Sequence, residues 1–172
     1  MTRPRCAAFL AMSLDGFISR PDGRVDWLDA YPAPPEDYAA FFAGVDTVLV
    51  GRATYDLVAT FPEWPYGTKR VAVLTHRPPA PRHGEVFLAG EPAEVLAGLA
   101  ASGSRSVYVD GGAVVSQFLA AGLLDELTVT VIPLVLGAGR RLFQGTLPER
   151  RLSLVASRVY PSGLVRITYR PT

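Results

Sequence analysis

Short β-prone apolar runs alternate with segments of helical periodicity along most of this chain, and this alternation limits the fold more than any other feature. Strands are predicted where the runs fall, over residues 6–12, 46–50, 70–75, 85–88, 105–109 and 125–133. Helices are predicted over residues 36–43, 54–60, 92–101 and 114–121. Helices placed between strands imply right-handed crossovers and a mainly parallel sheet.

The last two β-prone runs, 151–160 and 164–170, flank the turn sequence Pro161-Ser162-Gly163 and predict an antiparallel hairpin. The expected fold class is therefore α/β, with a mostly parallel central sheet and a C-terminal antiparallel hairpin. Segment 13–34 is rich in Asp-Gly and Pro-Pro turn chemistry and predicts a long loop. We expect residues 1–172 to form a single domain, because that length is usual for one domain.

Composition excludes several kinds of chemistry. Cys6 is the single cysteine, so an internal disulfide and a cysteine-held iron–sulfur cluster are excluded. The two histidines, His76 and His83, lie in proline-rich loops and are too few for most zinc sites, so we predict no metal. Schiff-base chemistry would depend on Lys69, the one lysine. Any redox reaction would therefore need a bound cofactor to supply its electrons.

Charge and hydropathy restrict the partners. The formal net charge is +1, so the chain lacks the positive field of a nucleic-acid-binding protein. No run reaches the roughly 18 apolar residues that a membrane helix requires, and the apolar stretch 6–14 has no cleavage site after it. We expect a cytoplasmic protein with no nucleic-acid or membrane partner.

Three predicted strands end in residues that suit a phosphorylated ligand. Gly51-Arg52-Ala53-Thr54 follows the strand at 46–50 and combines a close backbone approach, a planar cation and a hydroxyl. Thr75-His76-Arg77 follows the strand at 70–75 and again brings a hydroxyl and a cation. Asp110-Gly111-Gly112 lies between a strand and a helix, where two glycines permit tight contact with a pyrophosphate.

Carboxyl ends of strands are where open α/β sheets bind ligands, so the coincidence of the three segments predicts a nucleotide cofactor along that edge. Arg52 and Arg77 favour a cofactor with a 2′-phosphate, hence NADPH over NADH. The Gly-x-Gly-x-x-Gly fingerprint of the common dinucleotide-binding fold is absent from the chain.

Several segments form an ordered set along about residues 8–143: Ser13-Leu14-Asp15-Gly16, Trp27, Val48 to Tyr55, Val109-Asp110-Gly111-Gly112 with Val114 to Leu119, Leu124-Asp125-Glu126-Leu127 and Pro133 to Gly137. Together these segments resemble the dihydrofolate reductase-like superfamily. Within it, the chain is most similar to stand-alone proteins that resemble the reductase domain of the bifunctional riboflavin-biosynthesis deaminase–reductase.

This resemblance implies a three-layer dihydrofolate reductase-like fold, NADPH, and hydride transfer to a heterocyclic or carbonyl carbon. By position in the family pattern, Asp15 and Asp110 are the candidate catalytic residues, and Glu36, Asp37 and Phe41 are candidate substrate contacts. The candidate cofactor contacts are Trp27, Gly51, Arg52, Thr54, Thr75, Arg77, Gly111, Gly112 and Ala113.

Two departures from the family patterns leave the substrate open. Tyr55-Asp56-Leu57-Val58 stands where the riboflavin-type reductase carries Asp-Asp-Pro-x-Leu. Dihydrofolate reductases place a carboxylate on the first helix to work with the pterin ring, and Glu36 and Asp37 lie near that region without a convincing match.

Three functions remain open from the sequence. The first is an NADPH-dependent reductase resembling 5-amino-6-(5-phosphoribosylamino)uracil reductase, the second a dihydrofolate or pterin reductase, and the third a non-catalytic nucleotide-binding protein. Segment 137–141 predicts a turn, with a substrate-phosphate contact by Arg140 or Arg141 as the alternative. Because the resembled families include dimers, we expect a homodimer.

Overall fold

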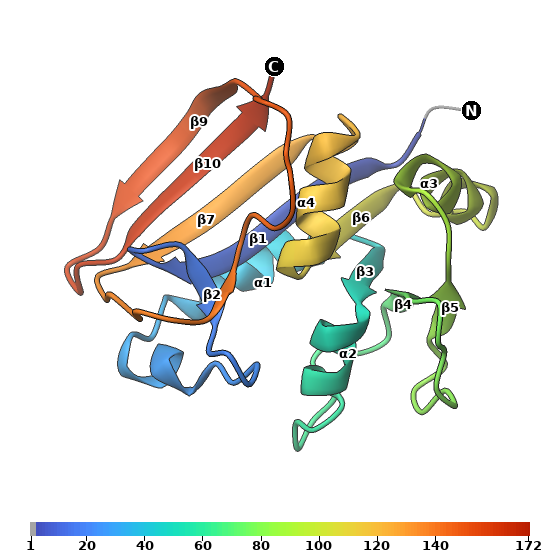
Figure 1. Ribbon diagram of the computed structural model, residues 1–172, viewed down its shortest axis with the longest axis horizontal. Coiled ribbons are helices and arrows are strands. Elements are labelled where there is room, and N and C mark those ends of the chain that lie inside the picture. Colours follow the sequence, from blue (N-terminus) through green and yellow to red (C-terminus); the bar gives the residue numbers. More distant parts are fainter. Residues whose placement is uncertain (1–2) are drawn as a thin grey trace.

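The computed structural model describes residues 3–172, which form an eight-stranded mixed sheet with helices packed on both faces (Figure 1). Its strand order is β5-β4-β3-β6-β1-β7-β10-β9. The strands of this sheet are β1 (Arg5–Ser13), β3 (Thr47–Gly51), β4 (Arg70–Leu74), β5 (Val86–Leu88), β6 (Ser106–Asp110), β7 (Glu126–Ile132), β9 (Leu152–Val159) and β10 (Val165–Pro171). The helices are α1 (Pro35–Ala43), α2 (Arg52–Val58), α3 (Pro92–Ala101), α4 (Gly112–Ala120) and the 3-10 helix η1 (Asp26–Ala30).

Strands β5, β4, β3, β6, β1 and β7 pair in parallel, whereas β10 is antiparallel to both β7 and β9. The alternation of strands and helices therefore predicted the sheet correctly, and the C-terminal hairpin is confirmed. The α/β fold class is confirmed as well.

Side chains that alternate along each strand feed two cores, one on each face of the sheet. Leu49 packs with Phe118 and the other buried residues of α3 and α4. Its neighbours Val48 and Val50 pack on the opposite face with Tyr55 of α2 and the aromatic side chains of α1. The two cores make the molecule three layers thick, as the resemblance implied.

The predicted loop over 13–34 is only partly correct. It contains β2 (Phe17–Ser19) and η1. Strand β2 pairs with β8 (Arg140–Arg141), which lies in segment 137–141, predicted as a turn. Strands of two and three residues are too short to show periodicity in the sequence. A glycine makes their approach feasible, because a Cβ on Gly139 would lie 2.1 Å from the carbonyl oxygen of Ser19.

Helix α2 begins two residues earlier than predicted, at Arg52, so Gly51 is its N-cap and Thr54 lies in its first turn. Strand β9 forms one edge of the sheet and has no helix over it (Figure 1). Within residues 3–172, no helix has both the length and the hydropathy that a membrane crossing needs.

Candidate active site

Three adjoining cavities form one cleft along the edge where the parallel strands end. An outer cavity of about 580 Å³ lies beside Thr75 and His76. A middle cavity of about 550 Å³ lies over Asp110 and the glycines after it, and shares Gly51, Arg52, Ala113 and Val114 with the outer one. An apolar cavity of about 310 Å³ shares Leu10, Ala11 and Leu28 with the middle one.

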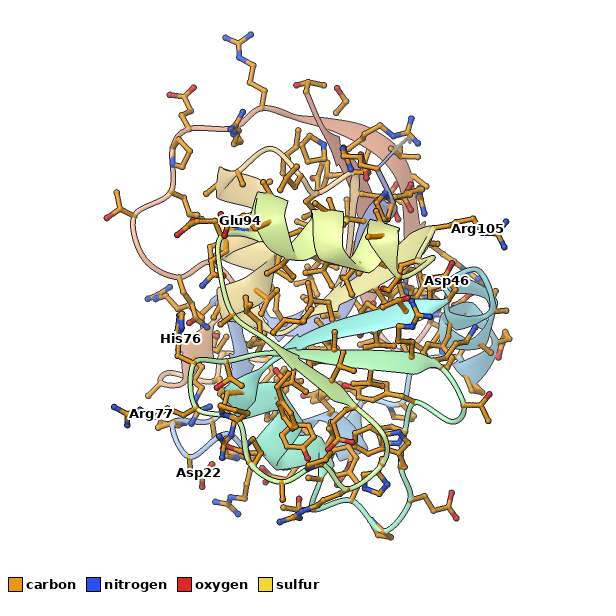
Figure 2. All side chains as sticks on the ribbon, turned by 90° about the vertical axis from the view of Figure 1, so that its right-hand side faces the viewer. Asp22, Asp46, His76, Arg77, Glu94 and Arg105 are labelled. Carbon is orange, nitrogen blue, oxygen red and sulfur yellow. The ribbon has the colours of Figure 1, made fainter. Side chains whose placement is uncertain are left out.

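The cleft lies on one side of the molecule. Figure 2 shows His76 and Arg77 on that side, and Asp46 and Arg105, which lie at the opposite ends of the strands, on the other. The carboxyl ends of β3, β4 and β6 therefore gather the three segments that the sequence singled out, as the rule for open α/β sheets predicts.

The turn from β6 into α4 requires its two glycines. Gly111 has a φ of +92°, and a Cβ on it would lie 2.4 Å from Oγ1 of Thr54. A Cβ on Gly112 would lie 2.7 Å from the carbonyl oxygen of Arg141. Helix α4 then begins without a side-chain cap, and Ala113 lies with both glycines in the lining of the middle cavity. The unpaired N–H groups of this helix end suit an anionic group.

Arg52 lines the outer and middle cavities and contacts the backbone of Arg77, whose own side chain lines none of the three cavities. Nε of Arg52 pairs with Asp56 at 2.8 Å, and its Nη1 donates to the carbonyl oxygen of Arg77 at 2.5 Å. Oγ1 of Thr75 accepts the backbone N–H of Arg77 at 3.1 Å, which fixes the loop after β4. The Arg77 side chain is exposed and forms no ion pair with any residue between 3 and 172.

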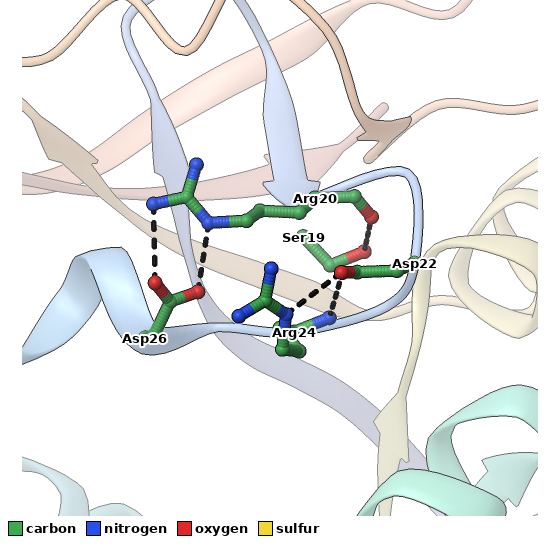
Figure 3. A network of polar contacts seen from close by, with 5 residues as sticks. All are labelled: Ser19, Arg20, Asp22, Arg24 and Asp26. Carbon is green, nitrogen blue, oxygen red and sulfur yellow. Dashed lines mark hydrogen bonds and ion pairs between the residues drawn. The ribbon is translucent and has the colours of Figure 1, made fainter.

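Two ion pairs hold the loop that forms the far wall of the middle cavity (Figure 3). Arg20 pairs with Asp26 at 2.7 Å, and Arg24 pairs with Asp22 at 2.7 Å. Between them, Gly23 lines the cavity beside the Arg140 guanidinium, which a Cβ on this glycine would meet at 3.6 Å. These pairs shape the wall, and Arg140 brings a cation into the cavity.

Asp110 is the carboxyl group best placed for proton transfer, because it lines the middle cavity and is half-buried. Its Oδ1 accepts the Gly111 N–H at 2.8 Å, and its Oδ2 lies 3.5 Å from the Tyr66 hydroxyl. Burial raises the pKa of the Asp110 carboxyl to about 6, although these two donors and the Tyr108 hydroxyl oppose the rise. Asp110 therefore exchanges a proton close to neutral pH.

Asp15, the other candidate catalytic residue, lies outside the lining of the three cavities. Its carboxylate accepts the Ser13 hydroxyl at 2.6 Å and the backbone N–H groups of Leu136 and Gly137 at 3.0 and 2.8 Å. The Ser13 hydrogen bond lowers the pKa of Asp15 to about 2. The ionised carboxylate thus joins the turn after β1 to the loop after β7, and its catalytic role stays a prediction.

The candidate substrate contacts occupy different environments. Asp37 accepts the Tyr160 hydroxyl at 2.7 Å and pairs with Arg166 at 2.5 Å and Arg158 at 3.2 Å. The Tyr160 hydrogen bond, with the two guanidinium groups, lowers the pKa of this carboxyl. Phe41 stacks on the Phe9 ring with centroids 4.9 Å apart.

None of the three predicted contacts lines the apolar cavity, and Glu36 is exposed. The cavity is instead lined by their neighbours Phe9, Tyr38 and Arg166. Arg166 was not among the residues predicted from the sequence, where its only signal is an arginine in the middle of a β-prone run. A charge in a strand does not reveal by itself that it faces inward.

Trp27 lies in η1 and is buried, with 5% of its surface exposed. It packs with Ile132, Tyr160 and Leu164, outside the lining of the three cavities. Its indole Nε1 is the one buried polar side-chain atom among residues 3–172 that has no hydrogen-bond partner. Its predicted contact with a cofactor stays a prediction.

The fold is of the dihydrofolate reductase-like class. The model of the RibD C-terminal domain matches residues 4–166, so the chain belongs to that family. It is 35% identical to the protein YwjB of Bacillus subtilis (strain 168) over 156 residues, which cover 88% of this chain and 90% of YwjB. Membership of this family supports a reductase-like function for the chain.

Solved structures agree with this assignment. A candidate riboflavin biosynthesis protein of Shewanella sp. PV-4 has a TM-score of 0.89 and 32% identity, covering 98% of this chain and 99% of that one. A dihydrofolate reductase of Enterococcus faecalis, in complex with NADP(H) and RAB-propyl, has a TM-score of 0.68 and 22% identity, covering 98% and 96% of the two chains. The second likeness shows the shared fold.

The raised pKa of Asp110 predicts a pH-dependent effect on stability. Its pKa of about 6 exceeds the usual 3.8, so ionisation opposes folding as the pH rises through this window. Asp110→Asn should therefore increase the free energy of unfolding at pH 8 by about 2–3 kcal/mol and leave it unchanged at pH 4. Urea denaturation at both pH values measures this, and an equal change at the two would contradict it.

Proposed function

We propose that this protein is an NADPH-dependent reductase that transfers a hydride to a small heterocyclic or carbonyl compound. The observation that carries the proposal is the continuous cleft at the strand ends, whose middle cavity is lined by Asp110 and adjoins both the outer cavity and the apolar one. Membership of the RibD C-terminal domain family supports the reaction class.

The residues of the outer and middle cavities fit NADPH, which would supply the hydride. The uncapped start of α4, with Gly111, Gly112 and Ala113, offers N–H groups to a pyrophosphate. Thr75 of the outer cavity offers a hydroxyl to a 2′-phosphate, and the exposed Arg77, two residues further along the same loop, would supply the cation. The complex of the Enterococcus faecalis reductase with NADP(H) supports a nicotinamide cofactor on this fold.

The apolar cavity suits the substrate, because it adjoins the middle cavity and because apolar walls disfavour water beside a transferred hydride. The reduction also consumes a proton, which the Asp110 carboxyl would hold and release in the middle cavity, next to the apolar one. In this scheme Arg52 keeps the loop after β4 in place through its bond to the Arg77 carbonyl.

A pyrimidine close to 5-amino-6-(5-phosphoribosylamino)uracil is the substrate that the family favours. The RibD C-terminal domain match and the likeness to the Shewanella protein support it. Arg140, which lines the middle cavity, is a candidate contact for a substrate phosphate. Arg141 instead lies over the Phe17 ring, 4.8 Å from its centroid.

A pterin substrate has less support. Asp37 lies on the first helix, where dihydrofolate reductases use a carboxylate, but Arg158, Arg166 and the Tyr160 hydroxyl occupy its oxygens. A carboxylate whose charge is already shared by two guanidinium groups has little left for a protonated ring nitrogen, and its lowered pKa makes it a poor proton donor. Turnover of dihydrofolate separates this alternative, and binding of NADPH without turnover of any pyrimidine, pterin or carbonyl compound would indicate a non-catalytic protein.

Replacement of Arg77 tests the cofactor assignment. Arg77→Ala should weaken NADPH binding about 10–100-fold and leave NADH binding unchanged, because a charged hydrogen bond to a phosphate contributes about 1.5–3 kcal/mol. Fluorescence titration with both cofactors measures this. Arg105→Ala, which removes an exposed arginine from the opposite side of the molecule (Figure 2), is the matched control. Equal losses for NADPH and NADH, or no NADPH binding by the wild type, would refute the assignment.

The role of Asp110 predicts a pH profile. If its protonated form donates to the substrate, kcat/KM should fall as the pH rises through about 6, where the carboxyl ionises. Asp110→Asn should lower kcat by about 10²–10⁴-fold and remove this limb of the profile. NADPH oxidation measured from pH 5 to 9 checks both, and an unchanged limb in the variant would exclude Asp110 as the donor.

We also propose that the protein is a homodimer in which a second copy covers β9. This outer strand exposes Leu154, Val155 and Val159 by 62%, 46% and 73%. Sedimentation should give twice the mass of the chain, and Leu154→Lys combined with Val159→Lys should give monomers. Val86→Lys, on the opposite sheet edge and 45% exposed, should leave the dimer intact. A monomeric wild type would refute the proposal.

A further inference from the structure

Arg166 is the buried charge of the apolar cavity. It lies in β10, in register with Thr130 of β7 and Arg158 of β9, and only 9% of its surface is exposed. Desolvation of a guanidinium is costly, so an inward-facing arginine in a strand requires compensation from its surroundings.

Four contacts fix the orientation of this guanidinium. Nε donates to Oγ1 of Thr130 at 3.0 Å, and Nη1 pairs with Oδ2 of Asp37 at 2.5 Å. The guanidinium carbon lies 4.9 Å from the Phe9 ring centroid and 5.2 Å from that of Tyr160. The cation is thus held in advance of any ligand, which lowers the entropic cost of using it for binding.

Compensation of the Arg166 charge is incomplete. Asp37 also pairs with Arg158, so two guanidinium groups share one carboxylate and the cluster has a formal charge of +1. Among residues 3–172, no side-chain or backbone acceptor forms a hydrogen bond with Nη2 of Arg166. This nitrogen is the part of the arginine left for a ligand.

The rest of the cavity wall is apolar or neutral. Among the described residues that line it, none is acidic and Arg166 is the only charged one. A volume of about 310 Å³ holds a molecule of one or two fused rings. An apolar slot with one fixed cation distinguishes ligands by charge.

We propose that Arg166 binds a negatively charged oxygen of the substrate, so that the apolar cavity selects small planar acids over neutral molecules of the same shape. A carboxylate or an ionised ring oxygen on an aromatic or heteroaromatic ring fits this description. This inference deepens the proposed function, because it takes the apolar cavity as the substrate site of the reductase.

The test uses two probes of equal shape, 2-naphthoate and its neutral amide 2-naphthamide. Calorimetric titration of the wild-type protein, with and without NADP⁺, should show the carboxylate binding at least about tenfold more tightly. Arg166→Met keeps the apolar stem and should reduce this preference to about twofold or less. The conservative Arg166→Lys should retain a preference of intermediate size, since it keeps the charge and loses the planar fork.

Arg158→Met is the matched control, because it removes the other arginine of Asp37, whose side chain is 61% exposed and does not line the cavity. It should keep the wild-type preference. Equal affinity of the wild type for both probes, no binding of either at about 10 mM, or equal effects of the Arg158 and Arg166 variants would overturn the proposal. Preference for the carboxylate without NADP⁺ binding would instead refute the reductase assignment alone.

Discussion

Parallel pairing of β6 with β1 on one side and β3 on the other brings the chemically important strand ends together, and the cleft depends on it. Asp110, the last residue of β6, is in register with Val50, so the turns that follow the two strands are neighbours. Thr54 and Gly111 consequently approach so closely that a side chain larger than hydrogen has no room. Strand β1 continues beyond its pairing with β6, and its Leu10 and Ala11 are shared by the middle and apolar cavities.

Three aspartates near this cleft have different pKa values because their surroundings differ. Asp15 and Asp37 are surrounded by donors, which lower the pKa of each, so both serve as fixed negative charges that join segments of the fold. Asp110 has fewer compensating donors for its burial, and its pKa rises to about 6. Only the third can carry a proton near neutral pH, and it is also the one that lines the middle cavity.

Features that depend on neighbouring residues in the sequence could be predicted, whereas those that depend on contacts between distant residues could not. The sheet and the glycine turn at Gly111 leave local patterns, so the strands, most helices and the three strand-end segments could be predicted. Strands β2 and β8 meet across more than a hundred residues and depend on the missing side chain of Gly139, which no local pattern reveals. The cluster of Asp37 and Arg166 joins α1 to β10, and neither residue signals its partner in the sequence.

The ion pair of Asp37 with Arg166 limits what Asp37 can do in the proposed reaction. With Asp37 held by two arginines, the carboxylate on the first helix cannot both bind a ring nitrogen and supply a proton. Its effect on the apolar cavity is indirect, since it holds the Arg166 guanidinium in place and leaves a positive wall. Proton supply then belongs to the other side of the cleft, at Asp110, where burial rather than a charge partner sets the pKa. In this scheme Arg166 holds the charge of the substrate and Asp110 delivers the proton. The distance between the two tasks matters, because a guanidinium beside Asp110 would lower the pKa of its carboxyl and keep it ionised at neutral pH.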